Sequence, residues 1–110
     1  STYAVLFNNT STTINHFKGN VITKTIQTTQ NQAYRFTMSA RKVNLGTKTP
    51  YLSLLIGTTK SASYALNGEW RTFSHVATPT NSSTLFTIYS DVADWNGNDY
   101  EITDLVIERE

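Results

Sequence analysis

The segment from residue 94 to residue 99, Asp-Trp-Asn-Gly-Asn-Asp, surrounds a tryptophan with short polar side chains. An indole held on a turn can stack on the apolar face of a pyranose ring, while neighbouring amides hydrogen-bond to the ring's hydroxyl groups. The pattern therefore suggests Trp95, Asn96 and Asn98 as ligand-binding residues. In the alternative interpretation, the Trp95 side chain folds back and caps the end of the domain.

Further candidates lie on expected strands. Tyr51 and Tyr89 fall on the opposite alternation from the apolar residues of their own segments, so both rings are expected on an exposed sheet face. A tyrosine there offers a stacking surface and a phenolic hydrogen bond together. If the strands belong to one sheet, Arg35 and Arg41 would line one groove with these tyrosines, which adds Arg35 to the ligand-binding candidates. The sequence does not say which strands pair.

Oxygen-bearing side chains gather in the same C-terminal loop, at Asp91, Asp94, Asn96, Asn98 and Asp99. Calcium takes six to eight oxygen ligands, so this loop is compatible with a calcium site. The spacing lacks the glycine and glutamate positions of an EF-hand loop. Solvated turn residues explain the same cluster equally well.

Catalytic chemistry has little support in the sequence. The chain has no cysteine and two histidines, His16 and His75, and no cluster with zinc-ligand spacing. A histidine-dependent nucleophile would need a serine and a carboxylate nearby, and no nucleophile elbow is present. Paired carboxylates for glycoside hydrolysis would come almost entirely from Glu69 and residues 91–110. We therefore expect no enzyme activity, and we expect His75 to be a hydrogen-bonded strand residue.

Charge is distributed unevenly along the chain, although the formal net charge is +1. Residues 1–90 carry a net charge of +7 and residues 91–110 a net charge of −6, so we expect the acidic segment to pair with basic neighbours. The lysines and arginines are scattered singly, which argues against nucleic-acid binding. No apolar run approaches the roughly 20 residues of a membrane helix, so membrane insertion is not expected.

The composition predicts an all-β chain. Its 110 residues include 19 threonines, 10 serines and 10 asparagines, and charged residues make up 15%. Threonine, aromatic and β-branched residues favour strands, whereas asparagine, serine and glycine favour turns. Short apolar runs, many of them alternating, predict strands at 3–7, 21–28, 33–41, 51–56, 63–66, 70–76, 85–90 and 100–108. Asn67-Gly68 is read as a hairpin turn. Together these features predict one domain over residues 1–110, an antiparallel β-sandwich, and specifically a jelly roll, of about eight strands.

Four segments resemble, in order, strands of the jelly-roll carbohydrate-binding modules, the galactose-binding-like β-sandwiches appended to bacterial glycoside hydrolases and phage tail proteins. They are residues 33–41 (AYRFTMSAR), 51–57 (YLSLLIG), 69–74 (EWRTFS) and 99–107 (DYEITDLVI). The resemblance implies the jelly-roll fold and a core position for Trp70 of the W-x-x-F pattern. Modules of this family usually hold a structural calcium, with an acidic pair in the last strand. Here that pair is Thr103-Asp104, in which only the second position is kept, and the N-terminal motif that supplies a further ligand is not recognisable. Asp104 and Asp99 are the metal-ligand candidates.

The resemblance implies a non-catalytic glycan-binding module of a larger extracellular or virion-surface protein, with carbohydrate as its partner. The alternative is a C-terminal trimerisation or receptor-binding domain of a phage tail fibre or tailspike, in which the exposed aromatic residues meet another chain of a homotrimer. A third interpretation is a strand-exchanging pilus-type subunit that donates its N-terminal strand, residues 1–7.

Overall fold

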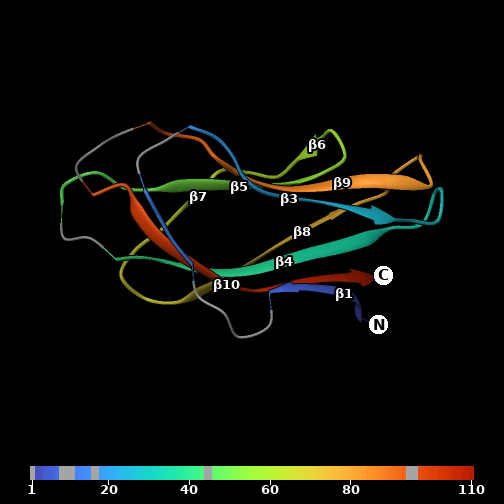
Figure 1. Cartoon of the computed structure of the whole chain (residues 1–110), viewed down its shortest axis with the longest axis horizontal. Coiled ribbons are helices and arrows are strands. Elements are labelled where there is room, and N and C mark those ends of the chain that lie inside the picture. Colours follow the sequence, from blue (N-terminus) through green and yellow to red (C-terminus); the bar gives the residue numbers. More distant parts are fainter. Residues whose placement is uncertain (1, 8–11, 16–17, 44–45, 94–96) are drawn as a thin grey trace.

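The computed structural model describes residues 2–7, 12–15, 18–43, 46–93 and 97–110, which form two antiparallel sheets packed face to face (Figure 1). Sheet A contains β1 (Thr2–Phe7), β2 (Thr12–Asn15), β4 (Tyr34–Lys42), β8 (Arg71–Ala77) and β10 (Asp99–Arg109). Sheet B contains β3 (Gly19–Gln27), β5 (Tyr51–Ile56), β6 (Thr59–Lys60), β7 (Tyr64–Ala65) and β9 (Ser83–Ser90). The predicted all-β jelly-roll sandwich is confirmed. β2 and the two-residue β6 were not expected.

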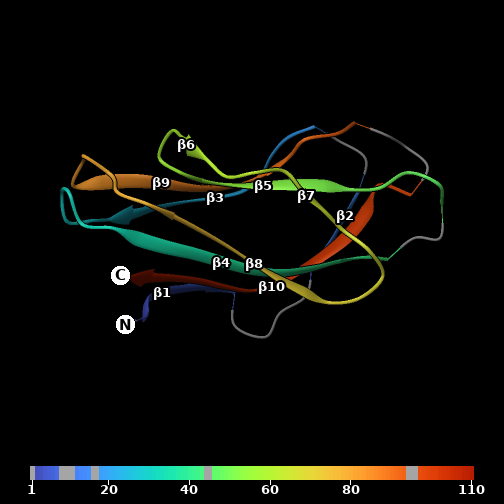
Figure 2. The ribbon, with the colours of Figure 1, turned by 180° about the vertical axis from the view of Figure 1, so that it is seen from behind.

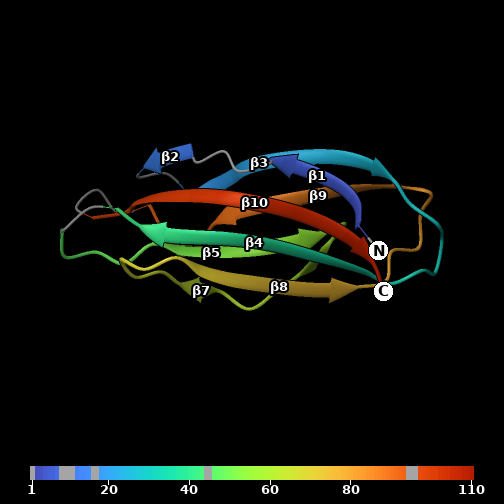
Figure 3. The same ribbon diagram turned by 90° about the horizontal axis from the view of Figure 1, so that it is seen from below.

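The order of strands places distant parts of the chain side by side. In sheet A the order is β1-β10-β4-β8, with β2 also pairing with β10; in sheet B it is β3-β9-β5-β6, with β7 also on β5. Figure 3 shows β10, β4 and β8 as neighbours in one layer. Thr2 lies opposite Glu108, so the first and last strands meet at one end of the sandwich (Figure 1).

Alternation of apolar and polar residues builds the core between the sheets. In β4 every second residue is buried, as predicted, namely Tyr34, Phe36, Met38 and Ala40. Sheet B contributes Phe86, whose ring meets those of Tyr34 and Phe36 edge to face, with centroids 6.3 and 5.5 Å away. Such aromatic pairs add roughly 0.5–1.5 kcal/mol each beyond burial.

A β-bulge lets β10 keep its apolar residues inward along eleven residues. Tyr100 and Ile102 are buried at even positions, whereas Leu105 and Ile107 are buried at odd ones. The change occurs at Asp104, which has a φ of 53°, where three steps on β10 face two steps on β4. Aspartate tolerates this left-handed conformation better than most residues, so Asp104 allows the backbone to form the bulge.

The segment containing β6 and β7 closes one side of the sandwich. The Tyr64 ring stacks on Phe73 of β8 with centroids 4.6 Å apart, and its hydroxyl donates to the Ser74 carbonyl oxygen at 3.0 Å. His75 Nε2 donates to the Thr59 carbonyl oxygen at 2.9 Å, which confirms the expected role of that histidine. Figure 2 shows β6 standing away from the layer of β5 and β9.

The predicted hairpin at Asn67-Gly68 is wrong. β7 pairs with β5 in sheet B, whereas β8 pairs with β4 in sheet A, so the chain crosses between sheets here. The Asn67 side chain accepts a hydrogen bond from the Glu69 N–H at 3.0 Å, which makes a local turn whose flanking strands do not pair with each other.

In the part of the chain described, no helix is long and apolar enough to span a bilayer.

Candidate functional site

Tyr51 and Tyr89 lie on the outer face of sheet B, as their alternation predicted. Their strands, β5 and β9, are hydrogen-bonded neighbours. Ser53 lies opposite Tyr89, so the two tyrosines are diagonal neighbours, roughly 7–8 Å apart by ordinary antiparallel geometry. Tyr51 is 38% exposed, and Tyr89 is partly buried. The two residues are called the tyrosine pair below.

A polar network lies beside the tyrosine pair and centres on Asp91, the residue after β9. Its Oδ2 accepts hydrogen bonds from the hydroxyl of Ser53 and from that of Ser63, the second at 2.7 Å. Its Oδ1 forms an ion pair with Lys60 Nζ at 2.9 Å. Its backbone N–H donates to the Tyr51 carbonyl oxygen at 2.9 Å. These four residues, Ser53, Lys60, Ser63 and Asp91, are called the Asp91 cluster.

The surroundings of Asp91 keep its carboxyl group ionised. Burial by itself would raise the pKa, because it removes water from the charged form. The hydrogen bonds from Ser53, Lys60 and Ser63, together with the positive charge of Lys60, outweigh burial and lower the pKa below its ordinary value of 3.8. The cluster is therefore a fixed ion pair without net charge.

Lys60 also connects this cluster to the tyrosine pair. Its Nζ lies 4.5 Å from the centroid of the Tyr89 ring, which is a cation–π distance. The ammonium is thus held between a carboxylate and an aromatic face, and it restrains the orientation of the Tyr89 ring. An oriented ring beside paired hydroxyls is a preorganised surface for a small polar ligand.

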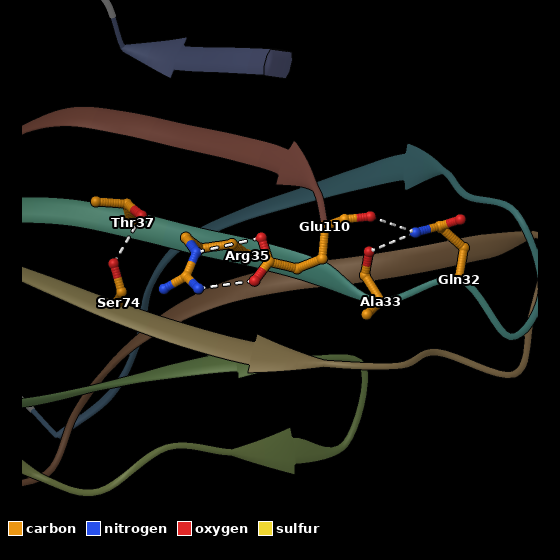
Figure 4. A network of polar contacts seen from close by, with 6 residues as sticks. All are labelled: Gln32, Ala33, Arg35, Thr37, Ser74 and Glu110. Atoms are coloured by element: carbon orange, nitrogen blue, oxygen red, sulfur yellow. Dashed lines mark hydrogen bonds and ion pairs between the residues drawn. The ribbon is translucent and has the colours of Figure 1, made fainter. Parts of the chain in front are cut away.

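Arg35 does not share a groove with the tyrosine pair. It lies on β4 of sheet A, and so does Arg41, so the predicted common groove is wrong. Figure 4 shows that Arg35 is bound by Glu110, with the shorter contact, Nη2 to Oε1, at 2.7 Å. Gln32 adds a hydrogen bond to the Glu110 carbonyl oxygen at 3.0 Å, so this network ties the last residue to β4.

Trp70 is exposed, and its predicted core position is wrong. The side chain is 42% exposed on the outer side of sheet A, and the Arg41 guanidinium lies 4.9 Å from its ring centroid. A spacing of three along a strand places Trp70 and Phe73 on opposite faces, and Phe73 is the residue that reaches the core. Trp70 therefore offers an aromatic surface on the opposite side of the molecule from the tyrosine pair.

Of the residues predicted in the C-terminal loop, Trp95 and Asn96 lie outside the described residues, and Asn98 is buried. The Asn98 Nδ2 donates to the Val92 carbonyl oxygen at 3.1 Å, and its Oδ1 has no partner among the described residues. A fully buried side chain cannot bind a ligand at the surface, so the prediction for Asn98 is wrong. Its bond to Val92 holds the loop closed instead.

The proposed calcium ligands do not meet. Asp99 begins β10 and Asp104 sits at the bulge, so five strand residues, or about 17 Å, separate them. Within residues 18–43, 46–93 and 97–110, no group of three or more histidine, cysteine or acidic residues is placed to hold a metal ion. Binding of calcium elsewhere in the 91–99 loop stays a prediction, which melting temperatures in calcium and in chelator would test.

Sequence reasoning missed the functional position of the Asp91 cluster. Asp91 was grouped with the C-terminal loop, whereas alternation from Tyr89 places it on the outer face of sheet B. Lys60 and Ser63 come from the β6–β7 segment, and nothing local in the sequence brings that segment to β9.

The predicted pairing of acidic and basic segments is confirmed by Arg35–Glu110, Arg41–Glu101 and Lys60–Asp91.

Two solved structures with a similar fold are titled as a sugar-binding protein and a xylan-binding domain. The EclA C-terminal domain, titled a sugar-binding protein, superposes with a TM-score of 0.83 at 24% identity, over 96% of this chain and 82% of that one. The CBM22-1 xylan-binding domain of Paenibacillus barcinonensis Xyn10C has a TM-score of 0.59 at 14% identity, over 77% of this chain and 62% of that one.

A third match, titled CBM4 structure and function, has a TM-score of 0.59 at 10% identity, over 80% of this chain and 59% of that one. The chain has the jelly-roll fold of carbohydrate-binding modules. It spans less than two thirds of the length of the two more distant structures. No family model matches the sequence, and no curated protein matches it. At these identities the likeness concerns the fold.

Proposed function

We propose that this chain is a non-catalytic module that binds neutral glycans on the outer face of sheet B. The observation that carries the proposal is the tyrosine pair. These two aromatic residues point outward from adjacent strands, and both lie next to the Asp91 cluster, which has no net charge. Tyr51 and Tyr89 stack on the apolar faces of sugar rings, and their hydroxyls bond to sugar hydroxyls. The titles of the similar structures support the same ligand class.

The Asp91 cluster positions the tyrosine pair. Its carboxylate oxygens are occupied by Lys60, Ser53 and Ser63, so Asp91 acts through its neighbours. Its backbone bond to Tyr51 and the contact of Lys60 with Tyr89 reach both rings. Because the ion pair is internally neutral, the face favours uncharged sugars over acidic ones.

A glycan array followed by calorimetric titration with the best neutral hit tests the proposal. We expect Tyr89→Ala and Tyr51→Ala each to weaken binding about tenfold or more, since the loss of a stacking aromatic residue costs on the order of 1 kcal/mol or more. Tyr89→Phe should retain most of the affinity. Trp70→Ala is the matched control, because it removes an equally exposed aromatic residue from the opposite sheet.

Two outcomes would contradict the proposal. One is an array without hits for wild type. The other is binding that Trp70→Ala abolishes and the tyrosine variants leave unchanged.

The expected solution state of a tethered binding module is a monomer, measured by light scattering. A homotrimer that buries Tyr51 and Tyr89 would instead support the assembly domain considered from the sequence.

We also propose that the module acts within a larger extracellular or virion-surface protein. The support is that similar domains belong to longer polypeptides, such as the Clostridium thermocellum Xyn10B structure titled as CBM22-1 and GH10 modules, of which the match covers 19%. Sites of weak affinity gain from being linked, because the second binding event becomes intramolecular. Fusing two copies with a flexible linker should therefore raise avidity for an immobilised glycan well above that of one copy.

A further inference from the structure

A cleft of about 460 Å³ lies at the end of sheet B where β5 ends and β9 begins, away from Asp91. Its walls come from the turn between β5 and β6 and from the connection between β8 and β9. Figure 1 shows β6 rising from the layer of β5 and β9 beside this end of the sandwich. The volume is within the range of small-ligand sites, which run from roughly 300 to 1,000 Å³.

All eleven residues that line the cleft are uncharged. Those with polar side chains are mainly threonines and short residues from the two loops, among them Thr58, Thr59, Thr78, Thr80, Asn81 and Ser83. The hydroxyl groups of Thr58, Thr78, Thr80 and Ser83 make no hydrogen bond to another described residue. These groups can both donate and accept, so they are free to match the alternating donors and acceptors of a polyol.

One wall of the cleft is apolar. Leu85 is 43% exposed on the outer side of β9 and lines the cleft. Pro79 lies in the same lining. An aliphatic wall facing a row of hydroxyls complements a sugar ring, which has one C–H face and a rim of hydroxyl groups.

From these features we infer that the cleft is a second sugar site, which takes one neutral sugar residue between the hydroxyls of Thr58 and Thr80 and the side chain of Leu85. Charged sugars are disfavoured because the lining holds no ion to pair with them. The inference rests on the proposed function for its ligand class, but it concerns separate residues. Leu85 lies four residues before Tyr89 on β9, about 13 Å along the strand, so one oligosaccharide could reach from the cleft toward the tyrosine pair.

An NMR titration of the ¹⁵N-labelled chain with D-xylose, D-glucose and D-galactose, and with D-glucuronate as the charged counterpart, tests the cleft directly. We expect a neutral sugar to shift the amide signals of residues 57–59 and 80–85 in a saturable way. The double variant Thr58→Val/Thr80→Val keeps the shape of the walls and removes one hydroxyl from each. It should weaken binding at these signals about tenfold.

Thr72→Val is the matched control, because it removes an exposed hydroxyl on sheet A and should leave the cleft titration unchanged. Tyr89→Ala should also leave it unchanged for monosaccharides. The inference is overturned if no neutral sugar moves the cleft signals, if the double variant binds as well as wild type, or if glucuronate binds as tightly as glucose. Shifts near Tyr51 and Tyr89 without shifts in the cleft overturn this inference alone. Silence at both places also contradicts the proposed function.

Discussion

The outer faces of the two sheets use similar residues in different ways. Sheet A pairs its polar side chains across strands at the surface, as in Thr37 with Ser74 at 2.9 Å and Ser39 with Thr72 at 3.1 Å. Its Arg41–Glu101 ion pair has side chains 39% and 18% exposed. On sheet B one carboxylate, 16% exposed, collects two serine hydroxyls and a lysine.

The comparison separates surface pairs from a network that is built into the sandwich. Exposed ion pairs contribute about 0–1 kcal/mol, because water screens them and side-chain entropy is lost. Glu101 and Asp91 are buried to similar degrees, 18% and 16% exposed, but their donors differ. The Arg41 guanidinium is exposed enough to be hydrated when its carboxylate is removed, whereas the fully buried Ser53 would lose its acceptor.

Each face thus holds a cation between a carboxylate and an aromatic ring, Arg41 on sheet A and Lys60 on sheet B. On sheet B the carboxylate also accepts hydrogen bonds from two serines, and a second ring, that of Tyr51, lies beside the first.

The largest expected effect concerns the two aromatic residues of the W-x-x-F pattern. Phe73→Ala should lower the free energy of unfolding by roughly 3–5 kcal/mol, because it opens a cavity in the core. Trp70→Ala should cost less, because that ring is 42% exposed and lies outside the core. Urea denaturation of both variants measures the difference. Equal losses would place Trp70 in the core after all.

The next effect compares the carboxylates of the two faces. Asp91→Ala should cost about 2 kcal/mol, since Ser53, Ser63 and Lys60 lose a shared acceptor. Glu101→Ala on sheet A should cost less, because the partner guanidinium of Arg41 is 39% exposed and is hydrated after the change. Chemical denaturation of the two variants provides the values. If Glu101→Ala proves the more damaging, the distinction between the faces fails.

A smaller effect distinguishes two buried tyrosines of sheet A. The Tyr34 hydroxyl accepts the Thr29 N–H at 2.8 Å, so Tyr34→Phe should cost about 1–2 kcal/mol. The Tyr100 hydroxyl lies near the Ser90 side chain without a well-formed hydrogen bond among the described residues, and burial raises the pKa of Tyr100 to about 12. Tyr100→Phe should change stability by less than about 0.5 kcal/mol. Thermal melts of the pair check the order, and a larger loss at Tyr100 would contradict it.

The smallest effect is a dependence on pH. The pKa of Asp91 is lower in the folded chain than its ordinary value of 3.8, so its contribution to stability is present above pH 3.8 and is lost as the pH falls through the folded value. Asp91→Asn should therefore lose less stability than wild type on acidification below this value. Melting temperatures across this range test the prediction, with Glu101→Gln as control. Parallel curves for wild type and Asp91→Asn would refute it.

The strands were predictable because alternation is a local property. Residues 33–41 alternate strictly, and the structure buries the expected four of them in β4. The apolar run after Pro50 and the alternation at 85–90 gave β5 and β9 in the same way. The bulge in β10 was not anticipated, because it is defined by the register of β10 against β4, which the sequence of β10 alone does not reveal.

The site was predictable only in part, because it depends on which strands pair. Alternation alone placed Tyr51 and Tyr89 outward, and sheet B brings them together. The same reasoning misplaced Arg35, since β4 belongs to the other sheet. Asn98 was predicted to bind ligand because its neighbours are polar, but its side chain is buried and donates a hydrogen bond to the Val92 carbonyl oxygen. Lys60 was missed because only the path of the β6–β7 segment carries it to Asp91.

The position of β10 also governs how the chain acquires its structure. β10 pairs with β1, β2 and β4, yet it is the last described strand to be synthesised. Among the described strands, β1 and β2 pair with β10 alone, so their pairing waits until residues 99–109 have emerged, whereas β4 can pair with β8 earlier. Topologies dominated by such distant contacts fold on the scale of milliseconds to seconds. Translation order thus makes the pairing of β1 and β2 with β10 the last step in the assembly of sheet A.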